Sequence, residues 1–227
     1  MVKTSDELSE RISILAGVCQ RLAQYIFIYE SLFDCEDSID LINRTAPNFF
    51  SRIGEALHTQ IFVDVGTLSD SEKSGYREGG RLNISVPSVT ANLEAENLSS
   101  PRVEDAKISF LNKCKEIRTF RSRFIAHRDD VSVRSQIDYA PEDGFQFPEI
   151  IELLQEFLDA VQDATGSTDS YTVRHADYPG SVNALLLCLR HLEADWLKVE
   201  QQVKLADRSS SFEHFFSQSN LKTRDKN

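Results

Sequence analysis

The chain has 227 residues, 41% of them hydrophobic and 27% charged, and a formal net charge of −11. This composition can build one sizeable core and excludes a disordered chain, so we expect a single domain over residues 1–207 and a polar tail over residues 208–227. The acidic balance excludes binding of nucleic acid over the whole surface, because phosphate contacts need clustered Lys and Arg; a polyanion site must be local.

The N-terminus, the cysteines and the histidines narrow the class of protein further. Residues 1–7 lack the charged-then-apolar order of a signal peptide, and no apolar run is judged long enough for a bilayer, so we expect a cytoplasmic protein without a membrane span. Cys19, Cys35, Cys114 and Cys188 lie far apart without a CxxC pair and are interpreted as reduced thiols. The five histidines are equally dispersed, so we expect no metal and no other cofactor.

The first half of the chain predicts three helices. Apolar residues spaced alternately by four and three form one stripe over residues 8–33, and Thr4 with Glu7 resembles a capping box at its start. Pro47 suits the first turn of a second helix, which is expected to end near Gly66. After a polar stretch with three glycines, Asn83 lies in the N-cap region of a shorter helix that ends at about residue 98.

The second half predicts three longer helices. Pro101 opens a helix whose apolar face stops at about His127, and Pro148 begins another that Gly166 closes. The last helix carries a stripe of Val182, Leu185, Leu189, Leu192, Trp196 and Val199. Trp196 is expected to lie in the core. Because no strand signal competes with these helices, the predicted fold class is all-α, with at most a trivial β element.

Cations gather between residues 113 and 128. Six of them stand against the single acid Glu116, a local balance of +5 in a chain of −11. They are Lys113, Lys115, Arg118, Arg121, Arg123 and Arg128. Such segregation focuses a positive field at one place on an acidic body, which is what a local phosphate site requires.

Two ionisable side chains in this stretch border the apolar face of the helix. Arg121 precedes Phe124 by three residues and His127 follows it by three, so both lie about 60° from Phe124 on successive turns. A histidine can take the proton of a ribose 2′-hydroxyl or protonate the leaving 5′-oxygen, while a guanidinium holds the phosphorane charge. Judged by spacing alone, the commoner alternative is that His127 caps the helix C-terminus and the arginines form a solvated face.

Several segments resemble one family. Arg121 to Asp129 (RSRFIAHRD) resembles the R-polar-(x4)-H motif of HEPN domains, in particular of the AbiU2-like branch. Leu57 to Asp70, Asn83 to Val86 and Tyr171 to Leu192 resemble that branch's helix with an acidic turn, its Asn-hydrophobic-Ser segment and its closing helix. The family more often has Asn or Asp where Ser122 stands. Asp129 occupies the place of a tyrosine that is modified in some toxin–antitoxin relatives, so that form of control is not expected here.

The resemblance implies an up-and-down HEPN-like helical bundle with additional C-terminal helices, dimerising through the motif helix. It also implies a metal-independent endoribonuclease that serves as a toxin or as a phage-defence (abortive infection) effector. The expected catalytic residues are Arg121, Ser122 and His127, and the expected RNA-binding residues are Lys115, Arg118, Arg123 and Arg128. RNA, a second copy and an antitoxin or other defence component are the expected partners. The alternative is a catalytically inactive HEPN module that binds RNA or a nucleotide, or acts as a protein-interaction scaffold.

Overall fold

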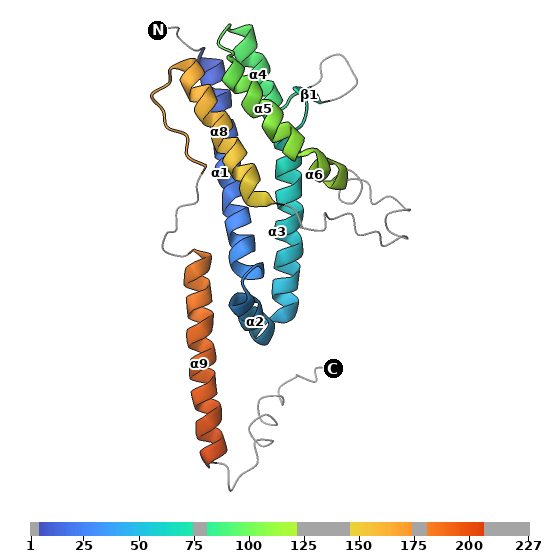
Figure 1. Ribbon diagram of the computed structural model, residues 1–227. Helices are drawn as coiled ribbons and strands as arrows, with labels where there is room; N and C mark the ends of the chain where they lie inside the picture. The colour runs from blue at the N-terminus through green and yellow to red at the C-terminus, as the bar shows by residue number, and fades with distance from the viewer. Residues whose placement is uncertain (1–4, 75–80, 122–145, 174–180, 207–227) are drawn as a thin grey trace, which may run out of the picture.

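The computed structural model describes residues 5–74, 81–121, 146–173 and 181–206 (Figure 1). Its helices are α1 (Asp6–Phe33), α2 (Glu36–Thr45), α3 (Pro47–Leu68), α4 (Val86–Ala95), α5 (Pro101–Lys113), α6 (Lys115–Phe120), α8 (Phe147–Thr165) and α9 (Val182–Ala206). Strand β1 (Lys73–Ser74) pairs antiparallel with β2 (Arg81–Leu82), with Lys73 opposite Leu82. The all-α prediction is confirmed, and this pair is the trivial β element. The predicted tail, 208–227, lies outside the described residues.

The core lies between α1 and the helices around it. Helix α1 packs against α3, α4 and α8, and α5 packs against α8 (Figure 1). The predicted stripe of α1 is confirmed over most of its length, because Leu8, Ile12, Leu15, Cys19, Leu22 and Ile26 are all buried. The stripe of α8 is confirmed as well, since Ile150, Leu154, Phe157 and Val161 are fully buried. Local periodicity therefore predicted the core faces of both helices.

Two helix caps differ from the prediction. Ser5, rather than Thr4, caps α1: its hydroxyl accepts a hydrogen bond from the Leu8 amide at 3.2 Å. Thr4 lies outside the described residues. Ser85, rather than Asn83, caps α4 and accepts from the Ser88 amide at 3.3 Å. Both serines have the extended backbone that a cap requires, and neighbouring polar residues were indistinguishable by composition. Gly166 does close α8, with a left-handed φ of 62°.

One helix was missed, and another is broken where a continuous helix was predicted. Helix α2 was missed, because ten residues with only Ser38, Leu41 and Ile42 buried leave no long stripe. The helix expected from Pro101 to about residue 127 is broken at Cys114, where ψ is −7°, into α5 and α6. The break lets α6 turn onto α3, while Cys114 and Ile117 stay buried.

The prediction for Trp196 is wrong. Its side chain is 63% exposed, and Leu192 is 66% exposed. Only the first part of α9 packs against the bundle, where Val182 and Leu186 join Leu41 and Ile42 of α2 in a second small core. The rest of α9 extends beyond the bundle (Figure 1). The stripe correctly marks an apolar face, but Leu192 and Trp196 in its second half are not covered by any described residue.

Helix α1 is long and apolar enough to cross a membrane by length and composition, with a mean hydropathy of 1.3 over an 18-residue window. This differs from the expectation that no apolar run reaches that length. In the structure its apolar stripe packs against α3, α4 and α8, and a buried core helix meets the same criterion. All four cysteines are free; Cys19 and Cys114 are buried, whereas Cys35 and Cys188 are exposed.

Candidate functional site

The described part of the predicted site lies on and just after α6. It contains Lys115, Arg118 and Arg121, whereas Ser122, Arg123, His127 and Arg128 lie outside the described residues. Helix α6 lies at the periphery, where α5 ends, and packs against α3 (Figure 1). The structure therefore tests the surroundings of the arginine of the motif and leaves the histidine as a prediction.

Arg121 continues the helical backbone of α6 and is anchored through its side chain. Its φ and ψ are −52° and −47°, and its amide donates to the Arg118 and Ile117 carbonyls. The Nη1 atom donates to both carboxylate oxygens of Asp70, at 3.2 Å and 3.3 Å. The two side chains are 28% and 35% exposed, so the ion pair is partly shielded from water.

Gly66 makes room for this side chain. A Cβ atom built on Gly66 would overlap the Arg121 side chain, reaching 2.9 Å from its Cζ atom. One turn earlier on α3, the ring of Phe62 contacts that of Phe120, with centroids 4.6 Å apart. One face of α3, at intervals of four residues, thus offers Phe62 as an apolar anchor, Gly66 as a gap and Asp70, just past the helix end, as a carboxylate. We call these three residues the Arg121 seat.

The turn after α3 is itself held in place, which positions Asp70. Ser69 is buried, and its hydroxyl donates to the Gly66 carbonyl at 3.0 Å. The Asp70 amide donates to the Thr67 carbonyl at 3.2 Å. The sequence interpretation included Asp70 in an acidic turn but gave it no role, and it took Gly66 for a helix end. The i, i+4, i+8 spacing of the three seat residues was the available signal.

Asp70 binds one nitrogen of the Arg121 guanidinium. Its hydrogen bonds to described residues come from Nη1 alone, whereas an arginine has five N–H donors distributed over three nitrogens. Asp70 therefore orients the planar group without using its full donor set. A guanidinium held in this way can bind a phosphate oxygen through the remaining donors.

The other described cations of the stretch divide into two groups. Lys113 is paired with Glu149 of α8, so it links α5 to α8. Lys115 and Arg118 are exposed, and neither forms an ion pair with another described residue. Burial raises the pKa of the Cys114 thiol to about 12, with partial opposition from the charge of Arg118. Cys114 is thus a neutral core residue rather than a nucleophile.

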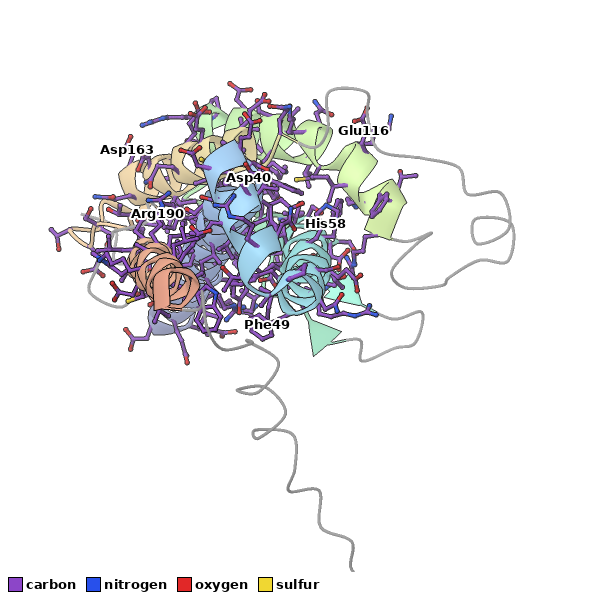
Figure 2. All side chains as sticks on the ribbon, turned by 90° about the horizontal axis from the view of Figure 1, so that it is seen from below. Asp40, Phe49, His58, Glu116, Asp163 and Arg190 are labelled. Atoms are coloured by element: carbon purple, nitrogen blue, oxygen red, sulfur yellow. The ribbon has the colours of Figure 1, made fainter. Side chains whose placement is uncertain are left out.

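Neither described histidine lies at Arg121. His58 of α3 packs between the rings of Tyr29, Phe62 and Phe147, and burial lowers its pKa. It precedes Gly66 by eight residues, about 12 Å along the helix. Figure 2 shows His58 among the helices and Glu116 at the outer edge of α6. His191 is exposed on α9, and the described residues contain no cluster of three potential metal ligands.

The fold and site define a class: an all-α bundle with an arginine seated at the end of a basic helix. The model of the HEPN_AbiU2 family, described as AbiU2, matches residues 10–185. The chain belongs to this family, and the predicted resemblance is confirmed. The matched region includes Arg121 and its seat and stops within α9. No curated protein and no solved structure matches significantly.

Proposed function

We propose that the chain is a metal-independent endoribonuclease that acts as a toxin or phage-defence effector in the cytoplasm. Membership of the HEPN_AbiU2 family suggests a ribonuclease or abortive-infection role. The observation that carries the proposal is the seat of Arg121, because a partly exposed guanidinium that Asp70 orients through Nη1 has further N–H donors of the kind that bind a phosphate.

In the proposed reaction, His127 acts as general base and takes the proton of the ribose 2′-hydroxyl. The 2′-oxygen forms a bond to phosphorus, the bond from phosphorus to the 5′-oxygen breaks, and that oxygen receives a proton from an imidazolium. The products are a 2′,3′-cyclic phosphate and a 5′-hydroxyl. Arg121 stabilises the charge that develops on the phosphorane, and the Ser122 hydroxyl hydrogen-bonds the phosphate or His127.

RNA contacts in this proposal come from the remaining cations of the stretch. Lys115 and Arg118 are exposed beside Arg121, which suits phosphate contacts, and Arg123 and Arg128 extend the same basic segment in the sequence. A second copy would bring its own motif helix, so that the composite site holds two histidines and two arginines. An antitoxin or another defence component is the expected regulator.

The test is cleavage of single-stranded RNA by the purified full-length chain in the presence of a chelator. We expect 2′,3′-cyclic phosphate and 5′-hydroxyl ends, no cleavage by His127→Ala, and a lower rate with a similar pH profile for Arg121→Ala, because a guanidinium does not titrate near neutrality. Arg102→Ala is a matched control. Arg102 is an exposed arginine at the start of α5, the end farther from Arg121, and it pairs with Asp163 of α8.

Two results of this assay would favour a binding function over catalysis. If RNA is bound but not cleaved, or if cleavage persists in a folded His127→Ala variant, the proposal fails and the inactive binding module is the better account. Replacing Lys115 and Arg118 together should flatten the dependence of log affinity on log salt by about two units, since each removes one phosphate contact. An unchanged slope would place the RNA elsewhere.

A further inference from the structure

Helix α9 carries an apolar face that the bundle covers only at its start. Val182 and Leu186 are buried against α2, and Leu189 is partly buried. Leu185, in the first turn, is 44% exposed, and farther along Leu192 is 66% and Trp196 63% exposed. A contiguous exposed patch of large apolar side chains on a regular helix marks an interaction surface more often than a solvated one.

The spacing of these residues is that of a helix-pairing seam. Alternate steps of three and four connect Val182, Leu185, Leu189, Leu192, Trp196, Val199 and Val203. These are the a and d positions of a heptad repeat sustained over three heptads, the pattern that packs one helix lengthwise against another. We call this set the α9 seam. Helix α9 contacts α1 and α2, and Val182 of the seam is buried there, whereas Leu192 and Trp196 are more than 60% exposed.

Charge indicates what kind of helix fits the seam. The e and g positions, which flank a seam, carry Glu193, Asp195 and Glu200 and no cation. The basic residues of α9, Arg190, Lys198 and Lys204, all fall at the outer b and c positions. Flanking charges determine which partner a seam accepts, so a row of acids favours a helix with basic flanks.

Helix α2 already shows this recognition at the start of the seam. Leu41 and Ile42 share a small core with Val182 and Leu186, while the Nε atom of Arg44 donates to Glu193 at 2.6 Å. Among the described residues, the neighbouring Asp195 pairs with Lys198 of its own helix at 3.0 Å, and both of those side chains are more than 70% exposed. An apolar face with an arginine at its edge is therefore the complement that the fold itself uses.

The same charges disfavour a second copy of α9. In a parallel pair, the g residue Asp195 would face the e residue Glu200 of the other copy, and in an antiparallel pair acids again face acids. Each chain also carries a net charge of −11, which adds to the repulsion. Repulsion between like charges across the seam therefore disfavours pairing of α9 with a second copy of itself.

We propose that the α9 seam docks an amphipathic helix of another protein, one with an apolar stripe flanked by lysines or arginines. The seam lies almost wholly beyond the family match, which ends at residue 185, and helix α9 extends away from α6 (Figure 1). Docking there leaves the Arg121 site accessible. The surface is independent of the proposed ribonuclease activity.

Trp196 is the only tryptophan of the chain and reports on the seam directly. The probes are two tryptophan-free peptides of four heptads with Leu at a and d, one with Lys and one with Glu at every e and g position. We expect the Lys peptide to shift Trp196 emission of the full-length protein to shorter wavelength in a saturable, salt-sensitive manner. The Glu peptide should cause no shift at the same concentration.

Variants of the full chain separate the seam from the rest of α9. Leu192→Asp should weaken binding of the Lys peptide at least about tenfold, as for a central interface residue. Leu187→Asp is the matched control, because Leu187 is 55% exposed on the outer face of the same helix. The affinity of this variant for the Lys peptide should change less than about twofold. Replacing Asp195 and Glu200 by Lys should reverse the preference toward the Glu peptide.

Three results would overturn the proposal. The first is equal binding of both peptides, and the second is no binding of the Lys peptide by a folded chain. The third is a Trp196 emission maximum that already lies at short wavelength in the protein alone, which would mean that the seam is covered. If light scattering then showed a mass that falls on Leu192→Asp, a second copy would be the occupant.

Discussion

Gly66→Ala should separate the stability of the fold from the position of the motif arginine. The added methyl group would overlap the Cδ and Cζ atoms of Arg121, which belong to a flexible side chain that is 28% exposed. The guanidinium can therefore move toward solvent instead of forcing α3 and α6 apart. In doing so it leaves Asp70 and the orientation that the seat imposes.

The expected change in stability is small because two terms oppose each other. Alanine in place of a helical glycine stabilises a helix by about 1 kcal/mol, and loss of a partly exposed ion pair costs about 0 to 1 kcal/mol. The free energy of unfolding, measured with urea, should thus change by less than about 1 kcal/mol. RNA cleavage should fall by about 10²-fold, the usual effect of removing one group that stabilises transition-state charge.

Gly17→Ala is the matched control, since Gly17 is exposed on α1 and a Cβ there would contact nothing within 4 Å. The free energy of unfolding of this variant should rise by about 1 kcal/mol, and RNA cleavage should be unchanged. A Gly66→Ala protein that cleaves RNA at the normal rate while Arg121→Ala is inactive would refute the role of the seat. A loss of stability above about 3 kcal/mol would show instead that the methyl meets a rigid neighbour.

Three further predictions concern the bundle. Burial lowers the pKa of His58 below 6.5, so its contribution to stability is present above that pH and is lost as pH falls through the folded pKa. In urea titrations at different pH values, His58→Phe should reduce this loss of stability. An unchanged pH profile would exclude His58 as its cause. Burial raises the pKa of Asp64 above 3.8, so the folded state favours the protonated carboxyl and this contribution to stability is lost as pH rises through the folded pKa. Asp64→Asn should therefore increase the free energy of unfolding by up to about 1 kcal/mol at pH 7, and a lower free energy of unfolding would contradict this. By calorimetry, Trp196→Ala should cost less than about 0.5 kcal/mol and Phe157→Ala about 3 to 5 kcal/mol, and equal costs would mean that Trp196 is buried.

Local pattern was sufficient for the helices that carry long apolar stripes. The buried faces of α1 and α8 follow from the spacing of their apolar residues, because a helix repeats every 3.6 residues whatever surrounds it. Helix α2 was too short for this signal. The assignment of caps to Thr4 and Asn83 failed by one or two residues, because neighbouring polar side chains compete for one position and backbone conformation decides between them.

The sequence marks Arg121 as a candidate site residue, but it does not reveal the surroundings of that side chain. Asp70 is 51 residues from Arg121 along the chain, so nothing local relates the two charges. The need for glycine at position 66 arises only when the break at Cys114 turns α6 across α3. For α9, the heptad spacing determined which face is apolar. Whether that face is covered depends on which elements the tertiary fold brings to it: α1 and α2 contact α9 and Val182 is buried, but Leu185, Leu192 and Trp196 remain exposed.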